Sequence, residues 1–161
     1  MAEDLTIKST SKEGRYKELF PQVKALLEGE KDMIANMANI CSALKYGLNF
    51  FWVGFYIVKN DELVLGPFQG TIACTRIKKG KGVCGAAWEK NETIIVDDVD
   101  KFPGHIACSS LSKSEIVVPV YNSKKEIIAI FDVDSDSIAS FDKTDEEWLT
   151  KISALLCEPP R

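Results

Sequence analysis

The residues of this chain best suited to chemistry are its cysteines. There are five, and Cys74, Cys84 and Cys108 fall close together with the spacing C-x9-C-x23-C. Structural zinc sites usually combine close-spaced cysteine pairs, and the chain has none and only one histidine, so we expect no metal ligands here. Free thiols are otherwise packing residues or redox groups, and both interpretations stay open at this point.

Cys84 lies near the start of a short predicted helix, residues 83–89, which the chain enters through Gly82. Backbone amides at a helix start would favour the thiolate of Cys84. Cys41 and Cys157 lie within helical hydrophobic patterns and are most simply buried thiols.

Cys108 follows His105 by three residues in an irregular segment, residues 97–113. A nearby imidazole would lower the pKa of the Cys108 thiol, although three residues of separation do not establish contact. The plainer interpretation of His105 alone is a histidine in a surface loop. The segment is long and irregular, so we expect it to move.

Three acidic side chains are predicted to meet at one end of a sheet face. Alternation along residues 126–134 places Asp132 and Asp134 on one face with Ile128 and Ile130, opposite a face formed by Ile127, Ala129, Phe131 and Val133. A hairpin turn at residues 122–125 brings Glu115 within about two residue pairs of Asp132. Carboxylates this close cannot all ionise cheaply, so at least one pKa should be raised. A solvated acidic run is the alternative.

Two aromatic residues are candidates for the wall of a pocket. In the predicted strand 49–59, Trp52, Gly54 and Tyr56 share one face, and the opposite face is wholly apolar: Phe51, Val53, Phe55 and Ile57. The apolar face should pack on helices. The other face carries two polar groups and a gap at the glycine, which suits a ligand wall, although ordinary core aromatics would give the same pattern.

The order of predicted elements indicates an α+β fold. The predicted elements follow one another in this order: a helical stretch, 14–45; strands 49–59, 62–68 and 71–77; a helix, 83–89; strands 93–96, 115–121 and 126–134; and a helix from Ser140 or Asp142 through Leu156. We expect one antiparallel sheet with the N- and C-terminal helices packed on one face and a ligand pocket on the other. A single domain, residues 1–161, is predicted, with residues 1–13 flexible or loosely docked.

Composition excludes several classes of protein. The 161 residues carry 20 Lys and Arg against 24 Asp and Glu, a formal net charge of −4, which disfavours nucleic-acid binding. The longest apolar run, residues 50–58, is far short of the ~20 residues of a membrane span. The N-terminus lacks the apolar core of a signal peptide. A cytoplasmic location is therefore expected.

Several motifs together resemble the GAF domain, and more narrowly the free methionine-(R)-sulfoxide reductases. They are NFFWVGFY, GPFQGTIACTRI, GKGVCGAAW, GHIACSS, EIVVPV and DVDS, and they extend over roughly residues 30–157. Three cysteines at these positions are specific to that family, because generic GAF modules lack them.

The resemblance implies reduction of the R epimer of free methionine sulfoxide to methionine, without a bound cofactor and with electrons from an external thioredoxin and NADPH system. It implies that Cys108 attacks the substrate and that Cys84 and Cys74 form or relay a disulfide with it. It assigns the substrate pocket to Trp52, Tyr56, Glu115, Asp132 and Asp134. A homodimer is plausible by analogy with other GAF modules.

The chemistry expected of these residues is consistent with that activity. The Cys108 thiolate would attack sulfur, Glu115 or Asp134 would supply the proton, and Cys84 or Cys74 would trap the sulfenic acid as a disulfide. Two other functions remain open. One is a GAF sensor, binding a small ligand or switching by cysteine oxidation, that acts on a partner in trans. The other is a reductase of methionine sulfoxide in peptides, which a closed acidic pocket disfavours.

Overall fold

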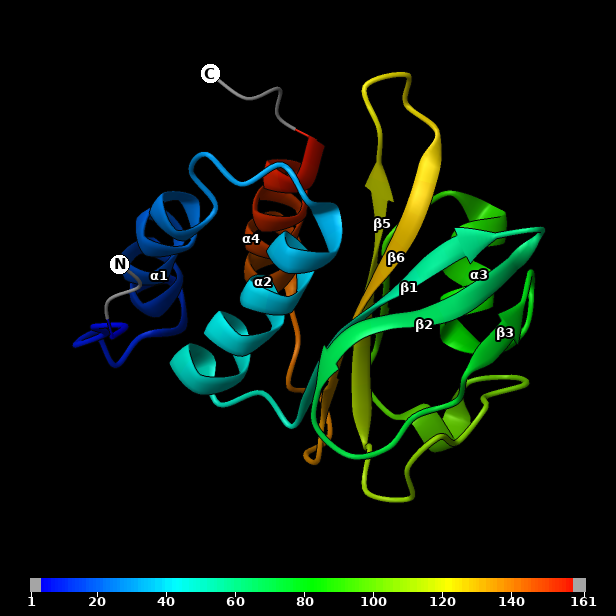
Figure 1. Ribbon diagram of the computed structural model, residues 1–161. Helices are drawn as coiled ribbons and strands as arrows, with labels where there is room; N and C mark the ends of the chain where they lie inside the picture. The colour runs from blue at the N-terminus through cyan, green and yellow to red at the C-terminus, as the bar shows by residue number, and fades with distance from the viewer. Residues whose placement is uncertain (1–3, 158–161) are drawn as a thin grey trace.

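A computed structural model describes residues 4–157, and its centre is one six-stranded antiparallel sheet (Figure 1). The strands are β1 (Trp52–Lys59), β2 (Glu62–Gln69), β3 (Arg76–Lys78), β4 (Ile94–Val96), β5 (Ser114–Tyr121) and β6 (Ile127–Ser135). The helices are α1 (Lys12–Leu26), α2 (Met33–Leu48), α3 (Gly82–Lys90) and α4 (Lys143–Ala154), with short 3-10 turns η1 (Val99–Lys101) and η2 (Leu155–Cys157). The strand order is β3-β2-β1-β6-β5-β4, which confirms the predicted antiparallel α+β fold.

Helices cover the two faces of the sheet unequally. Figure 1 shows α1, α2 and α4 together on one face and α3 alone on the other. Val53, Phe55 and Ile57 of β1 pack into the core under the three helices, whereas Trp52 and Tyr56 pack on the α3 side. The predicted placement of the N- and C-terminal helices on one face is therefore confirmed.

Two details of the predicted strand faces are wrong. Phe51 precedes β1, so alternation does not govern it, and it packs on the α3 side. A register shift at the end of the β5–β6 pair also leaves Ile128 as an extra residue, because Val120 pairs with Ala129 and Tyr121 with Ile127. Such a bulge exchanges the faces of the residues beyond it, so Ile128 packs under the helices and Ile127 on the other side.

The described part of the N-terminal segment contacts the core and α1. Leu5 and Ile7 pack against the core under the helices. The Thr6 amide donates to the Gln22 side chain over 2.9 Å, so the segment is tied to α1. Residues 4–13 thus contact the rest of the molecule, and Lys12 and the residue after it already belong to α1. That residues 1–13 are flexible or loosely docked stays a prediction.

Local signals explain the helix boundaries. The predicted helical stretch divides into α1 and α2 at a turn where Gly29 has φ +82°, a value that favours glycine. Asp142, and not Ser140, caps α4, because its side chain accepts from the Thr144 amide and takes part in a capping box. These signals position the two ends of the helical layer over the sheet.

The segments that carry Cys74 and Cys108 are loops. Of the expected strand 71–77 only the last two residues belong to β3, which runs from Arg76 to Lys78 and pairs with β2, so Cys74 lies in the loop before it. Residues 102–113 contain no helix or strand, as predicted for this irregular part of the chain.

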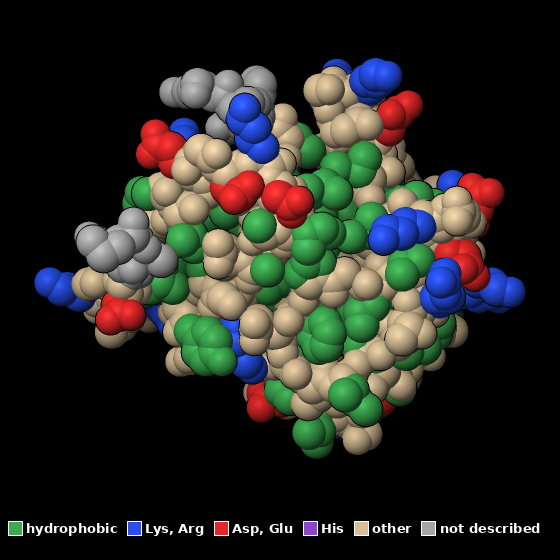
Figure 2. All heavy atoms as spheres, in the orientation of Figure 1, with side chains coloured by type: hydrophobic (Ala, Val, Ile, Leu, Met, Phe, Trp, Pro, Cys, Tyr) green, Lys and Arg blue, Asp and Glu red, His purple; other side chains and the backbone are tan. Residues whose placement is uncertain are grey.

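Two features of the structure relate to the expectations that the protein neither binds nucleic acid nor spans a membrane. Figure 2 shows acidic and basic side chains interspersed around the visible face, without one continuous basic area. Within residues 4–157, no helix has both the length and the apolar character that crossing a membrane requires.

Candidate active site

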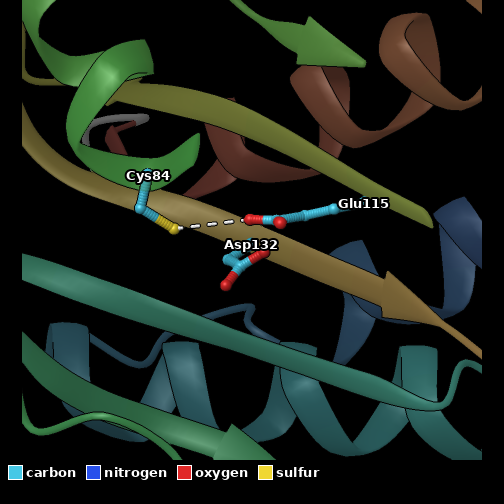
Figure 3. A group of neighbouring side chains, drawn as sticks. All are labelled: Cys84, Glu115 and Asp132. Carbon is cyan, nitrogen blue, oxygen red and sulfur yellow. Dashed lines mark hydrogen bonds between the residues drawn. The ribbon is translucent and has the colours of Figure 1, made fainter. Parts of the chain in front are cut away.

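Register places the acidic side chains together at one end of the β5–β6 pair. Glu115 lies directly opposite Asp134, and Val117 lies opposite Asp132 on the same face. This confirms the predicted convergence of the three acids. Cys84 comes in from α3, and Figure 3 shows its sulfur directed toward Glu115, with Asp132 beside the pair. The Cys84 thiol lies 3.9 Å from Glu115 Oε1.

Burial gives the three carboxyl groups an unusual affinity for protons. Burial, and then the charge of neighbouring carboxylates, raises the pKa of Glu115 and Asp132 well above the ordinary range. Burial also raises the pKa of Asp134, to about 6, although a hydrogen bond from Ser112 opposes the shift. The cluster therefore holds protons near neutral pH and can act as a general acid.

Cys84 does not behave as the sequence suggested. It is the third residue of α3, but it is only 3% exposed. Burial, and then the nearby Asp132 and Glu115, raises the pKa of its thiol well above the ordinary value. Desolvation and two carboxyl groups outweigh the amides at the helix start, so the expectation of a stabilised thiolate is wrong.

The structure joins Cys74 to Cys108 in a disulfide, with their Cα atoms 5.5 Å apart. This separation lies well within the range that a disulfide requires. Both cysteines are half-buried, and their bond links the loop before β3 to the irregular segment before β5. Of the two partners left open for Cys108, the structure pairs it with Cys74 and leaves Cys84 free.

The polar groups of Trp52 and Tyr56 hold the loop that carries Cys74. Trp52 Nε1 donates to the Thr71 carbonyl over 2.9 Å, and the Tyr56 hydroxyl donates to the Cys74 carbonyl over 3.0 Å. A Cβ atom on Gly54 would lie 2.4 Å from the Trp52 ring. The expected gap at Gly54 is therefore filled by that ring, not left for a ligand.

Two further polar residues complete the site. His105 is not a surface histidine: its side chain is 14% exposed, and Nε2 lies 4.0 Å from Glu115 Oε2. Burial lowers the pKa of His105, so the imidazole is neutral at pH 7 and forms no ion pair there. Ser112, a buried partner of Asp134, was missed because a serine in an irregular segment carries no pattern.

These groups surround a small cavity of about 40 Å³. Apart from neighbouring residues of the loops, of β3 and of α3, its lining comprises the predicted site residues and the two polar additions: Trp52, Tyr56, Cys84, His105, Cys108, Ser112, Glu115, Asp132 and Asp134. Cys74 is not among the lining residues but is bonded to Cys108, which is. One cavity thus brings together a disulfide and proton-bearing carboxyl groups.

Three of the groups also have the spacing of a metal site. One ligand atom from each of Cys84, Glu115 and Asp132 lies within 4.8 Å of the others. A thiolate with two carboxylates is a possible ligand set for zinc. The raised pKa of each group means that a metal ion would have to displace protons from this buried site.

The α+β sheet with this cavity on the face opposite its terminal helices defines a GAF-type module. A model of the GAF domain family matches residues 30–156. The chain belongs to the GAF domain family. It is 62% identical over 157 residues to GAF domain-containing protein A of Dictyostelium discoideum, covering 97% of this chain and 99% of that protein.

Within this family the chain is closely similar to the free methionine-R-sulfoxide reductases. It is 38% identical to the enzyme of that name from Saccharomyces cerevisiae, over 91% of this chain and 86% of the other. The free methionine-R-sulfoxide reductase of Neisseria meningitidis, solved in complex with its substrate, has a TM-score of 0.93 and 47% identity, covering 97% of this chain and 93% of that one. The resemblance of the motifs is thereby confirmed over nearly the whole chain.

Proposed function

We propose that this protein is an oxidoreductase that reduces free methionine-(R)-sulfoxide to methionine, with Cys108 as the nucleophile. The observation that carries the proposal is the position of Cys108, which lines the acidic cavity and is bonded to Cys74. Similarity to free methionine-R-sulfoxide reductases over nearly the whole chain supports the same activity.

The reaction needs a nucleophile at sulfur and a proton for oxygen. The Cys108 thiolate attacks the sulfoxide sulfur, oxygen passes to the cysteine, and the sulfide leaves as methionine with Cys108 as a sulfenic acid. The Cys74 thiolate then attacks the Cys108 sulfur, forming the disulfide and releasing the oxygen as water after protonation. Two electrons thus pass from the two cysteines to the substrate.

Glu115 is our candidate for the proton donor, with Asp134 beside it. Both face the cavity, and their raised pKa values keep protons available near neutral pH. Cys84 also donates toward Glu115, and we assign it the role of a buried hydrogen-bond partner of the acid cluster. Trp52 would exclude water from the methyl and thioether part of the substrate.

The acidic cavity suits a free amino acid. Asp132 is 6% exposed, and its Oδ1 accepts no hydrogen bond from the described residues. An α-ammonium group could satisfy this buried acceptor, whereas the amide of a methionine residue within a peptide carries no such charge. We therefore expect turnover of free methionine-(R)-sulfoxide and little turnover of its N-acetyl derivative. Equal kcat/KM values for the two would contradict the assignment.

The cycle closes when an external dithiol reduces the Cys74–Cys108 disulfide. A thioredoxin-type protein recharged by NADPH supplies such a dithiol, and no bound cofactor is needed. The cytoplasm is the compartment that we propose, because it keeps such dithiol proteins reduced.

Single-turnover chemistry tests the nucleophile directly. Reduced wild-type protein should release close to one methionine per chain from the R epimer without added reductant, and little from the S epimer. Cys108→Ser should release none. Cys157→Ser, which removes a thiol outside the cavity, should release as much as the wild type. Methionine release by Cys108→Ser would reassign the nucleophile, and no release by the wild type would favour a non-catalytic sensor.

A further inference from the structure

Exposed apolar side chains gather on the two loops that the disulfide joins. Ile72 is 88% exposed, Leu111 57% and Ile106 39%, although each is large and apolar. Ile72 lies two residues before Cys74, and the other two flank Cys108. Isolated apolar residues are normal on a protein surface, but Ile72 and Ile106 both line the cavity, so the two bridged loops bring exposed apolar side chains to one place.

The stretches next to the two cysteines are basic. Residues 71–81 and 101–113 contain six Lys and Arg and no Asp or Glu, although three aspartates, Asp97, Asp98 and Asp100, immediately precede the second stretch. Arg76 pairs with Glu62 and Lys101 with Asp98, and the carboxylate of Glu89 lies against the backbone of residue 80.

Lys81 has no such partner and lies next to the apolar rim. Within the described residues it forms no salt bridge and no capping hydrogen bond. It precedes Gly82, where a Cβ atom would lie 3.3 Å from Ile106. A cation therefore borders the exposed apolar side chains beside the disulfide.

We propose that Ile72, Ile106 and Leu111, bordered by Lys81, form a docking surface for a dithiol protein whose reactive thiols lie in an apolar patch with acidic neighbours. This inference rests on the proposed function, because it concerns the partner that resets the enzyme. Hereafter these four residues are called the disulfide rim. Apolar contact would hold the partner in place, and opposite charge would raise its rate of encounter.

The redox step that the rim would support is balanced. A thiolate of the partner attacks one sulfur of the Cys74–Cys108 disulfide, forming a mixed disulfide and releasing one enzyme thiolate. The second thiol of the partner then displaces the other enzyme cysteine. The partner is oxidised to a disulfide, and the enzyme regains two thiols.

The half-buried position of the disulfide makes the rim important for a protein reductant but not for a small-molecule reductant. Both cysteines are half-buried, so a protein thiol reaches the disulfide only if the partner surface seats against the loops around it. A small dithiol such as dithiothreitol needs no such seat. The rim therefore matters to reduction by a protein and not to reduction by a small molecule, and this difference can be measured.

The experiment compares two reductants on the full chain. Methionine formation from free methionine-(R)-sulfoxide is followed with thioredoxin, thioredoxin reductase and NADPH, and separately with dithiothreitol. The variants are Leu111→Ser and Lys81→Glu. Their matched controls are Ile34→Ser, which alters a side chain 47% exposed on α2, and Lys124→Glu in the β5–β6 turn.

We expect both rim variants to lower kcat/KM for thioredoxin by about tenfold, the loss typical of an important interface residue. Dithiothreitol-driven rates should stay at the wild-type value in all four variants, which also shows that they fold. Raising the salt concentration should lower kcat/KM for thioredoxin in the wild type and less in Lys81→Glu.

Three results would overturn the docking surface while leaving the reductase activity intact. The first is unchanged thioredoxin kinetics in both rim variants, and the second is an equal loss in the rim and control variants. The third is a wild-type protein that forms methionine when dithiothreitol is the reductant but forms none when thioredoxin is the reductant. Absence of methionine formation with dithiothreitol would instead overturn the proposed function itself. The two failures are therefore distinguishable.

Discussion

The Tyr56 hydroxyl donates a hydrogen bond of 3.0 Å to the carbonyl of Cys74. This bond connects a central strand of the sheet to the loop that carries one half of the disulfide. Tyr56 is only 2% exposed, so the core fixes its ring. Its hydroxyl is the group that reaches the loop. The sheet thereby positions the cysteine that we propose to trap the oxidised Cys108.

Removing this hydroxyl should separate the two steps of the reaction. In Tyr56→Phe the ring stays buried, but the Cys74 carbonyl loses its donor, at a cost of about 1 kcal/mol in the free energy of unfolding. We expect methionine release in a single turnover to persist while disulfide formation slows several-fold. Rapid quenching that counts methionine and free thiols in parallel would measure both. A disulfide that forms as fast as in the wild type would show that the bond does not position Cys74.

Substrate binding should depend on the redox state of Cys74 and Cys108. Residues of both loops that the disulfide joins line the cavity, among them Ile72, Ile106 and Cys108. The disulfide holds these two walls together and occupies the sulfur that must face the substrate, so we expect reduced protein to bind methionine sulfoxide more tightly than oxidised protein. Calorimetry should detect tighter binding of free methionine-(R)-sulfoxide to reduced Cys108→Ser than to oxidised wild-type protein. Equal affinities would contradict a binding site whose walls depend on the disulfide.

Alternation along strands made much of the site predictable. It predicted that Trp52 and Tyr56 lie on the face opposite Val53 and Phe55, and that Glu115 lies close to Asp132. The structure confirms both predictions. These predictions succeeded because a regular strand pair in the middle of a sheet leaves one register and two faces.

What escaped prediction depends on irregular structure and on burial. The extra residue at Ile128 breaks alternation, and no local pattern announces a bulge of this kind. The pairing of Cys108 with Cys74 depends on where two loops meet. The raised pKa of Cys84 depends first on burial and then on Asp132 and Glu115, which lie on strands distant in sequence. The position of Cys84 at the start of a helix therefore predicted a lowered pKa for its thiol, whereas the pKa is raised.

Protonation of the acid cluster should make stability depend on pH. Burial raises the pKa of Asp134 from 3.8 to about 6. Between these values the folded chain binds the proton that the unfolded chain has lost, so stability decreases as the pH rises through this window. Above about pH 6 the cost reaches its full value, on the order of 3 kcal/mol.

Asp134→Asn should remove that cost because asparagine stays neutral. We expect the variant to exceed the wild type in free energy of unfolding at pH 7.5 and to match it near pH 4, while its reductase activity falls. Urea unfolding at a series of pH values would measure the difference. Asp136→Asn, at an exposed position two residues further on, is the control and should follow the wild type. Parallel curves for Asp134→Asn and the wild type would show that Asp134 is not destabilised by burial.

The absence of a side chain at Gly54 should be essential to the shape of the cavity. A Cβ atom there would lie 2.4 Å from the Trp52 ring and 2.6 Å from Phe68 Cβ, so Gly54→Ala must displace the ring that stacks on Phe68. Overpacking of this kind costs about 1–3 kcal/mol. We expect that loss in urea unfolding, together with lower kcat/KM because Trp52 lines the cavity. Gly47→Ala is the matched control: its new Cβ would meet only the ends of flexible side chains, and alanine favours a helix, so it should leave both quantities near wild type. If Gly54→Ala behaved like this control, the Trp52 ring would not depend on the space above the glycine.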